Sequence, residues 1–191
     1  MDDTPYQRPA VLDAILTDAE RLGFTMSCED RTGSLLATLA ASKPGGHVLE
    51  LGTGVGAGAA WLLSGMSQDA RLTTVEVAPD TQAVARRHLG HDPRVQFVTA
   101  DADEWLTDYD GPPFDLAYVD CRPGKFRRLD ELVAHLTRGA LYAVDDLLPQ
   151  ATWPCDHEPR VDSFLKLFPE QPNLLATPLA WASGLVIAAR L

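Results

Sequence analysis

The sequence predicts an α/β protein with a seven-stranded, mostly parallel sheet, an antiparallel last strand and helices on both faces. Two observations indicate the parallel part. Short apolar runs alternate with stretches of helical period, and the first run leads directly into the glycine-rich residues 52–58. The antiparallel end is predicted because a break of only residues 181–184 separates the last two apolar runs. Parallel strands joined by helices, with a glycine turn after the first strand, are typical of Rossmann-like folds.

Two helices are predicted ahead of the sheet. In residues 9–23 apolar side chains recur at helical spacing, namely Val11, Leu12, Ile15, Ala19 and Leu22. A second helix is predicted over residues 31–42, with Thr32 or Ser34 as its N-cap. The Pro-Gly-Gly sequence at residues 44–46 then breaks the helical pattern.

Five strand–helix units and two closing strands follow. The strands are predicted at residues 47–51, 71–77, 94–100, 114–120, 140–146, 173–180 and 183–190. The helices are predicted at residues 57–66, 79–90, 101–108, 125–138 and 162–168. No repeat or low-complexity segment interrupts this order.

Length and composition are those of one domain. With 191 residues, 46% of them apolar and 23% charged, the chain can bury roughly 70% of its unfolded surface. It has no uninterrupted run of roughly 20 apolar residues, and its first thirty residues are too acidic for a secretory signal. We therefore expect a cytoplasmic protein that does not contact membranes.

Charge and cysteine content exclude two further classes. The net charge is −11 and no Lys/Arg cluster is longer than a pair, so nucleic acid is not an expected partner. The three cysteines, Cys28, Cys121 and Cys155, are odd in number and form no CxxC pair. They are expected to be reduced thiols rather than a disulfide framework or a zinc site.

Acidic residues recur at the ends of the predicted strands. They are Glu50, Glu76, Asp101, Asp120 and the pair Asp145-Asp146. One such acid is usually a helix N-cap or a turn residue. Five successive strands would, however, bring all six carboxylates to one edge of the sheet, where they repel one another. This recurrence predicts a ligand with hydroxyl groups and positive charge, or a divalent cation.

The ordered motifs VLELGTGVG, TTVEV, TADADEWL, FDLAYVD and GALYAVDD resemble those of class I S-adenosylmethionine-dependent methyltransferases. Within that class the chain is most similar to small bacterial O-methyltransferases related to the catechol and caffeoyl-CoA enzymes, from about residue 24 to 191. The resemblance implies methylation of a small, catechol-like hydroxylated acceptor. It also implies that residues 44–191 bind the cofactor, while helices in residues 1–43 pack on this core and help to form the acceptor site.

The resemblance assigns residues to each part of S-adenosylmethionine. Those expected along its methionine part are Glu50, Gly52, Thr53, Gly54, Gly56 and Gly58. Glu76 is expected to receive both ribose hydroxyls, while Val77, Asp101 and Ala102 are expected at the adenine. Asp120 is expected to border both the cofactor and the reacting groups.

Two other functions stay open. Gly52-x-Gly54-x-x-Ala57 also fits a loose dinucleotide fingerprint, and Glu76 could hold the ribose of NAD(P) in an oxidoreductase. Against this, Glu50 stands where dinucleotide strands keep a small apolar residue, and no second domain is present for hydride chemistry. The other alternative is an S-adenosylmethionine-binding protein without catalysis.

In metal-dependent relatives an Asp at the end of the fourth strand and an Asp-Asn pair at the end of the fifth hold a cation. The matching residues are Asp120, Asp145 and Asp146, whose oxygens suit Mg²⁺, Mn²⁺ or Ca²⁺. Two departures are present: Asp146 replaces the Asn, and Pro123 stands where those relatives have a lysine. We expect Lys125 to act with Asp120 in catalysis, the alternative being a solvated charge at the start of a helix.

The acceptor side is the least defined part of the site. Trp153 and His157, in the predicted loop after the acid pair, are candidates for a wall against a planar acceptor, the alternative being an ordinary surface loop. A homodimer is the other partner considered. Leu35, Leu36 and Leu39 are candidates either for its interface or for the core.

Overall fold

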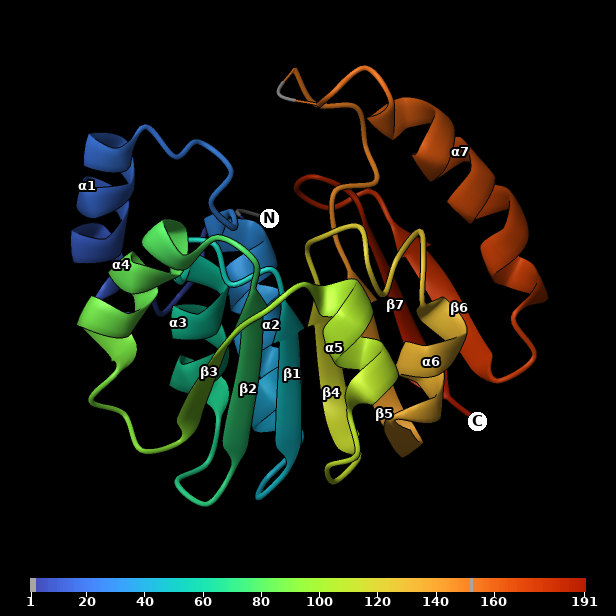
Figure 1. Cartoon of the computed structure of the whole chain (residues 1–191), viewed down its shortest axis with the longest axis horizontal. Coiled ribbons are helices and arrows are strands. Elements are labelled where there is room, and N and C mark those ends of the chain that lie inside the picture. Colours follow the sequence, from blue (N-terminus) through green and yellow to red (C-terminus); the bar gives the residue numbers. More distant parts are fainter. Residues whose placement is uncertain (1–2, 152) are drawn as a thin grey trace.

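Seven strands form one sheet in the order β3-β2-β1-β4-β5-β7-β6 (Figure 1). The computed structural model describes residues 3–151 and 153–191. The strands are β1 His47–Leu51, β2 Arg71–Glu76, β3 Val95–Thr99, β4 Phe114–Val119, β5 Leu136–Val144, β6 Leu174–Leu179 and β7 Leu185–Arg190. Strands β1 to β5 pair in parallel, whereas β7 runs antiparallel between β5 and β6. The predicted fold class is confirmed.

Helices cover both faces of the sheet. They are α1 Leu12–Leu22, α2 Asp30–Ala41, α3 Ala57–Gly65, α4 Pro79–Leu89, α5 Ala102–Asp108, α6 Leu129–Ala134 and α7 His157–Leu167, with a 3₁₀ turn at Phe168–Glu170. Figure 1 shows α5 and α6 in front of the sheet and α2 behind it. Side chains alternate between the faces, so Val48 of β1 packs with α1 to α4 while Leu49 packs with α5, α6 and α7. The helices expected before residue 44 therefore share one core with α3 and α4.

The order of the strands positions the site. From β1 the chain builds outward to β2 and β3, and then returns to place β4 on the other side of β1. Loops leaving the carboxyl ends of β1 and β4 diverge at this point, which leaves a crevice where ligands bind in open α/β sheets. Glu50 of β1 is in register with Thr74 on one neighbour and Tyr118 on the other.

The structure corrects the start of α2. The helix begins at Asp30, so neither Thr32 nor Ser34 is its N-cap. Thr32 is fully buried inside the helix, and Ser34 donates its hydroxyl to the carbonyl of Arg31 at 3.0 Å. The cap prediction was wrong because burial of Thr32 against the core outweighs its capping preference.

The predicted helix at residues 125–138 is also wrong over most of its length. Residues 124–126 form a turn, and the Gly124 amide donates to the Arg127 carbonyl at 2.7 Å. Helix α6 is short, and β5 already begins at Leu136, which pairs with Phe114 of β4. Pairing and burial of Leu136 override its helical period. No helix among the described residues is both long and apolar enough to cross a bilayer.

Candidate functional site

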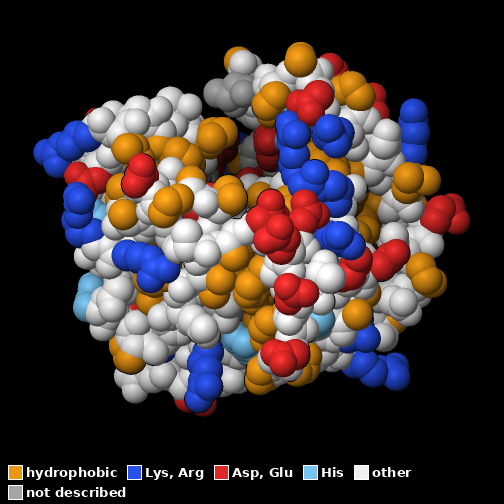
Figure 2. All heavy atoms as spheres, viewed as in Figure 1, with side chains coloured by type: hydrophobic (Ala, Val, Ile, Leu, Met, Phe, Trp, Pro, Cys, Tyr) orange, Lys and Arg blue, Asp and Glu red, His pale blue; other side chains and the backbone are white. Residues whose placement is uncertain are grey.

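A cavity of about 690 Å³ opens at the carboxyl ends of β1, β2, β4 and β5. In Figure 2 the surface is hollowed at the top of the view, and acidic and basic side chains stand close together near this hollow. The cavity brings together most residues expected from the sequence: Glu50, Gly52, Thr53, Gly54, Gly58, Glu76, Asp120, Lys125, Asp145, Asp146, Trp153 and His157. Residues predicted from five separate segments thus line one space.

Four expected cofactor residues do not line this cavity: Gly56, Val77, Asp101 and Ala102. Gly56 instead packs on α4, because a Cβ there would lie 2.7 Å from the Cβ of Ala85. Asp101 caps α5 by accepting the Asp103 amide at 2.8 Å, and Ala102 is nearly buried. Val77 is 65% exposed, so its apolar face is available beside the site. Contact of these residues with adenine stays a prediction.

The loop after β1 lies close to the end of β4. At Gly52, where φ is 96°, a Cβ would lie 2.8 Å from the carbonyl oxygen of Asp120. Only glycine tolerates both that φ and that approach. The Gly54 amide donates to Glu76 Oε2 at 2.9 Å, so the loop is held to the end of β2 as well.

Glu76 presents an oriented carboxylate to the cavity. Its Oε2 accepts the Gly54 amide and its Oε1 accepts the Ala78 amide, both at 2.9 Å. A carboxylate oxygen has two lone pairs, so each oxygen keeps one for a ligand. The arrangement suits a pair of neighbouring hydroxyl groups.

Glu50 lies at the end of a buried hydrogen-bond chain. Thr74 donates to Glu50 Oε2 at 2.5 Å, and the hydroxyls of Thr74 and Thr53 are 2.6 Å apart. Gln82 donates to Thr53 at 3.3 Å, which orients the chain from Gln82 through both threonines to Glu50. Glu50 Oε1 is buried and has no hydrogen-bond partner among the described residues.

Burial raises the pKa of Glu50 from 4.5 to about 8, and the hydrogen bond from Thr74 opposes this shift. The carboxyl group is therefore poised to ionise when a positively charged group approaches. Gly58 contacts it so closely that a Cβ there would collide with Oε1.

The carboxylates of Asp145 and Asp146 are occupied by protein donors. Asp145 Oδ1 accepts the Ser183 hydroxyl and the Asp146 amide, and its Oδ2 accepts the Tyr118 hydroxyl at 3.0 Å. Asp146, at a φ of 65°, accepts the Trp153 indole on Oδ1 and lies 3.2 Å from His157 Nε2 through Oδ2. Burial, reinforced for Asp120 by the charge of Asp145, raises the pKa of both Asp120 and Asp145.

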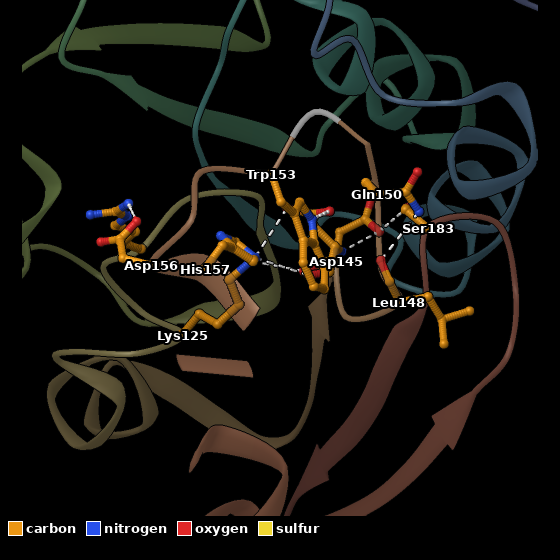
Figure 3. A network of polar contacts seen from close by, with 10 residues as sticks. Lys125, Asp145, Leu148, Gln150, Trp153, Asp156, His157 and Ser183 are labelled. Carbon is orange, nitrogen blue, oxygen red and sulfur yellow. Dashed lines mark hydrogen bonds and ion pairs between the residues drawn. The ribbon is translucent and has the colours of Figure 1, made fainter. Parts of the chain in front are cut away.

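Lys125 is buried in the same region, with 3% of its surface exposed. Its Nζ donates to the carbonyl oxygen of Asp145 at 2.9 Å and lies 4.9 Å from the ring centre of Phe126. Figure 3 shows the side chain reaching toward Asp145 beneath His157. The alternative of a solvated charge at the start of a helix is therefore wrong.

These acids do not fit the metal site that the resemblance implies. In residues 3–151 and 153–191, no group of three or more His, Cys, Asp or Glu side chains is arranged to hold a metal. Each carboxylate oxygen of Asp145 and Asp146 faces at least one protein donor, and Asp145 Oδ1 faces two, so the donors fix the directions of both carboxylates. A cation of the Mg²⁺ type needs such oxygens directed at one point.

Trp153 and His157 form one aromatic unit with ring centres 4.5 Å apart. His157 is 7% exposed and is the first residue of α7, so its prediction as a loop residue was wrong. The segment is not an ordinary surface loop, because both side chains line the cavity. Burial lowers the pKa of His157, which favours the neutral imidazole.

Sequence reasoning missed the segment between α1 and α2. Residues 24–29 line the cavity, and the Phe24 ring would lie 3.1 Å from a Cβ at Gly54. Tyr118, Arg122 and Ser183 were missed as well. The only available signal was Phe24 directly after Gly23, a helix-ending glycine. Cys28, Cys121 and Cys155 are free, as predicted.

The chain was compared with known proteins. A family model described as "Methyltransferase domain" matches residues 49–147, just over half of the chain. A Mycobacterium sp. (strain KMS) protein named "Putative O-methyltransferase" is 32% identical over an alignment of 142 residues that covers 64% of this chain and 64% of that protein. The match thus spans slightly less than two thirds of this relative's length.

Solved structures agree with the fold. A structure named as that of a "putative O-methyltransferase" from Klebsiella pneumoniae has a TM-score of 0.82 at 25% identity, covering 97% of this chain and 91% of that one. An O-methyltransferase from Bacillus cereus in complex with SAH has a TM-score of 0.84 at 20% identity, covering 99% and 94%. These matches give the nicotinamide-dehydrogenase alternative no support. Because the family model covers more than half of the chain, including most strands and acids that build the cavity, this chain belongs to the methyltransferase domain family.

Proposed function

We propose that the chain is an S-adenosylmethionine-dependent O-methyltransferase acting on a small hydroxylated acceptor, with a catechol-like phenol as the expected class. The observation that carries the proposal is the Glu76 carboxylate, which two backbone amides hold at the cavity with one free lone pair on each oxygen. This geometry suits the two ribose hydroxyls of the cofactor. The SAH-bound Bacillus cereus neighbour, which shares the fold, supports the choice of cofactor.

The rest of the cavity fits the positively charged part of that cofactor. Glu50 Oε1 is buried without a partner, directly behind the glycine loop and in contact with Gly58. An unpaired buried oxygen is costly, so a cationic amino group bound beside the loop would stabilise it, directly or through the loop. When bound, the cofactor would supply a methyl group, carried on a positively charged sulfur, for transfer to an acceptor oxygen.

The chain's own residues hold and align the two reactants. Glu76 and the glycine loop fix the cofactor from one side, which leaves the end of the cavity near Asp120 and Lys125 for the acceptor hydroxyl. Such alignment alone can lower the barrier by several kcal/mol. A phenol with a pKa near 10 also needs a cation or base at pH 7, and Asp120 and Lys125 are the candidates.

Trp153 and His157 are proposed as the wall that receives a planar acceptor, because their paired rings line the cavity. Residues 1–43 are proposed to contribute to the same site through the segment at 24–29, while residues 44–191 bind the cofactor. Metal assistance by Mg²⁺, Mn²⁺ or Ca²⁺ was implied by the resemblance. It has no support from the arrangement of Asp120, Asp145 and Asp146.

A homodimer and a cytoplasmic location are kept as proposals. Leu36 is buried in the core, whereas Leu35 lines an apolar groove with Trp181 on the outer side of α2. We expect Leu35→Glu to weaken any dimer. Sedimentation velocity of wild type and variant tests this, and a monomeric wild type would end the proposal.

Calorimetric titration of S-adenosylmethionine tests the proposed function. Glu76→Ala removes two charge-assisted hydrogen bonds to ribose, each contributing about 1.5–3 kcal/mol, so affinity should fall at least about a hundredfold. Glu104→Ala, an exposed acid outside the cavity, is the matched control and should bind as wild type does. Equal affinity of wild type and the Glu76 variant would reject the ribose assignment.

Binding without catalysis is the remaining alternative. Transfer of label from S-adenosylmethionine to a panel of catechols and other small hydroxylated aromatics separates it from an enzyme. Turnover that depends on the acceptor is the expected result. Cofactor binding without turnover of any acceptor would favour a non-catalytic protein.

A further inference from the structure

We propose that the ammonium group of Lys125 is the built-in cation of this site, standing in place of a divalent metal, so that methyl transfer needs no metal ion. This role rests on the proposed function, since the Lys125 ammonium would bind the oxygen of the methyl acceptor. The resemblance implies a metal held by Asp120, Asp145 and Asp146, but among the described residues these acids are not arranged to hold one.

The backbone before Lys125 directs its side chain inward. Gly124 has a φ of 80°, and a Cβ there would lie 2.8 Å from Leu51 Cδ1, so the turn packs against the end of β1. The buried Tyr142 hydroxyl donates to the Gly124 carbonyl at 2.8 Å, and the Gly124 amide bonds to Arg127. These contacts come from β1 and β5 and fix the turn that carries Lys125.

The position of Nζ is that of a cation among acids. Its hydrogen bond to the carbonyl of Asp145 places it where the ends of β4 and β5 meet. Asp120, the residue after β4, lines the same cavity, so the ammonium group lies among carboxylates. Burying a lysine is costly unless neighbouring negative charge compensates it.

The ammonium keeps donors for a ligand. It has three N–H bonds, and among the described residues only the one to Asp145 has a hydrogen-bond acceptor. Lys125 lines the same cavity as Asp120. A free N–H can therefore bind an acceptor oxygen.

The carboxylates of Asp145 and Asp146 are oriented by protein groups rather than toward a common cation. Asp145 is held by Ser183 and Tyr118, and Asp146 is held by Trp153 and His157. Their carboxylates are thus used to orient the protein, while a backbone carbonyl binds the internal cation. The change from the relatives' lysine position, now Pro123, to Lys125 matches this rearrangement.

With Lys125 as the cation, methyl transfer can proceed without a metal ion. The acceptor O–H bond breaks, and its proton passes to the Asp120 carboxylate, while Lys125 stabilises the negative charge that develops on oxygen. The oxygen forms a bond to the methyl carbon as the carbon–sulfur bond breaks. The sulfur leaves with that electron pair as a neutral thioether.

Manganese binding, followed by electron paramagnetic resonance, tests the proposal apart from activity. The chelator-treated wild type should bind Mn²⁺ no more tightly than about 1 mM, in the range of weak oxygen sites. Lys125→Met leaves the carboxylates of Asp145 and Asp146 on their protein donors, so it should bind Mn²⁺ as weakly as the wild type does. Lys166→Met, an exposed lysine of α7, is the control and should match wild type.

Tight Mn²⁺ binding by the wild type overturns the proposal, and so does turnover that is lost on chelation and restored by a divalent metal. With catechol acceptors, wild-type turnover should survive exhaustive chelation, and it should fall in Lys125→Met and partly return in Lys125→Arg. Calorimetry with S-adenosylmethionine on each variant reports both folding and cofactor binding. A wild type that binds no cofactor would contradict the proposed function. The manganese measurement would still test the proposal for Lys125.

Discussion

At the scale of single residues, the cavity contains two glutamates with different partners, the buried Glu50 and the half-buried Glu76. Glu76 has two amide donors, whereas Glu50 has one hydroxyl donor and one oxygen without a partner. The first is prepared to bind neutral hydroxyls, and the second to meet positive charge. Two carboxylates of similar chemistry thus acquire different tasks from their surroundings.

The raised pKa of Glu50 predicts how stability depends on pH. In the folded protein Glu50 keeps its proton up to about pH 8, whereas the unfolded chain releases it near 4.5. The stability that protonated Glu50 adds to the folded protein is therefore fully present below pH 4.5 and is lost as pH rises to 8. Within this window the unfolding free energy of the wild type should fall as pH rises. In Glu50→Gln this slope should be smaller by roughly 1 kcal/mol per pH unit.

Urea titrations of the cofactor-free protein between pH 5 and 8 provide the measurement. Glu104→Gln, which changes an exposed acid, is the matched control and should leave the slope as it is. Parallel pH profiles for wild type and Glu50→Gln would show that Glu50 is ionised in the folded protein and would contradict this account.

Residue types and their spacing predicted most members of the site, but not their roles. Asp101 and Glu76 look alike in the sequence, yet Asp101 caps α5 outside the cavity. Lys125 could not be predicted to be buried, because the carbonyl and the carboxylates that compensate its charge come from β4 and β5. Long-range partners of this kind leave no local pattern.

At the scale of elements, the glycine loop packs closely against a neighbouring helix where it enters α3. Gly56 is the left-handed residue before α3, and it touches Ala85 of α4. The loop therefore couples the cofactor end of β1 to the packing of two helices.

Gly56→Ala should destabilise the protein by about 2–4 kcal/mol. The substitution forces an L side chain to a φ of 97° and also creates a clash 2.7 Å from Ala85. Gly23→Ala is the matched control, since its φ is 71° but nothing lies within 4 Å of the added Cβ. It should cost only about 1 kcal/mol. Urea unfolding of both variants measures the difference, and equal losses would mean that the contact with α4 adds nothing.

Strands were predicted more accurately than helix ends, for a physical reason. Buried parallel strands such as β1 and β4 are apolar runs bounded by glycine or acid, and these bounds are local. Helix α6 was predicted too long because Leu136 satisfies both a helical period and a strand pair with Phe114. Helix α7 begins five residues before its predicted start, because its first turn is polar and contains Pro159.

At the scale of the whole molecule, all parts of the site depend on the strand order. Glu50, Glu76, Asp120 and Asp145 lie far apart in the sequence and meet only because β1 lies between β2 and β4, with β5 beside β4. The alternation of strand and helix patterns predicted that sheet, and hence the shared edge. It could not predict that residues 24–29 would fold over the edge, since that segment belongs to neither pattern.

The central claim is that one cavity holds the cofactor with its ribose on Glu76. A crystal structure of the protein with S-adenosylhomocysteine tests this most directly. The account predicts both ribose hydroxyls at hydrogen-bond distance, about 2.6–3.2 Å, from the Glu76 carboxylate, with the amino acid end beside the glycine loop. A ribose placed elsewhere, or a cavity left empty at saturating ligand, would contradict it.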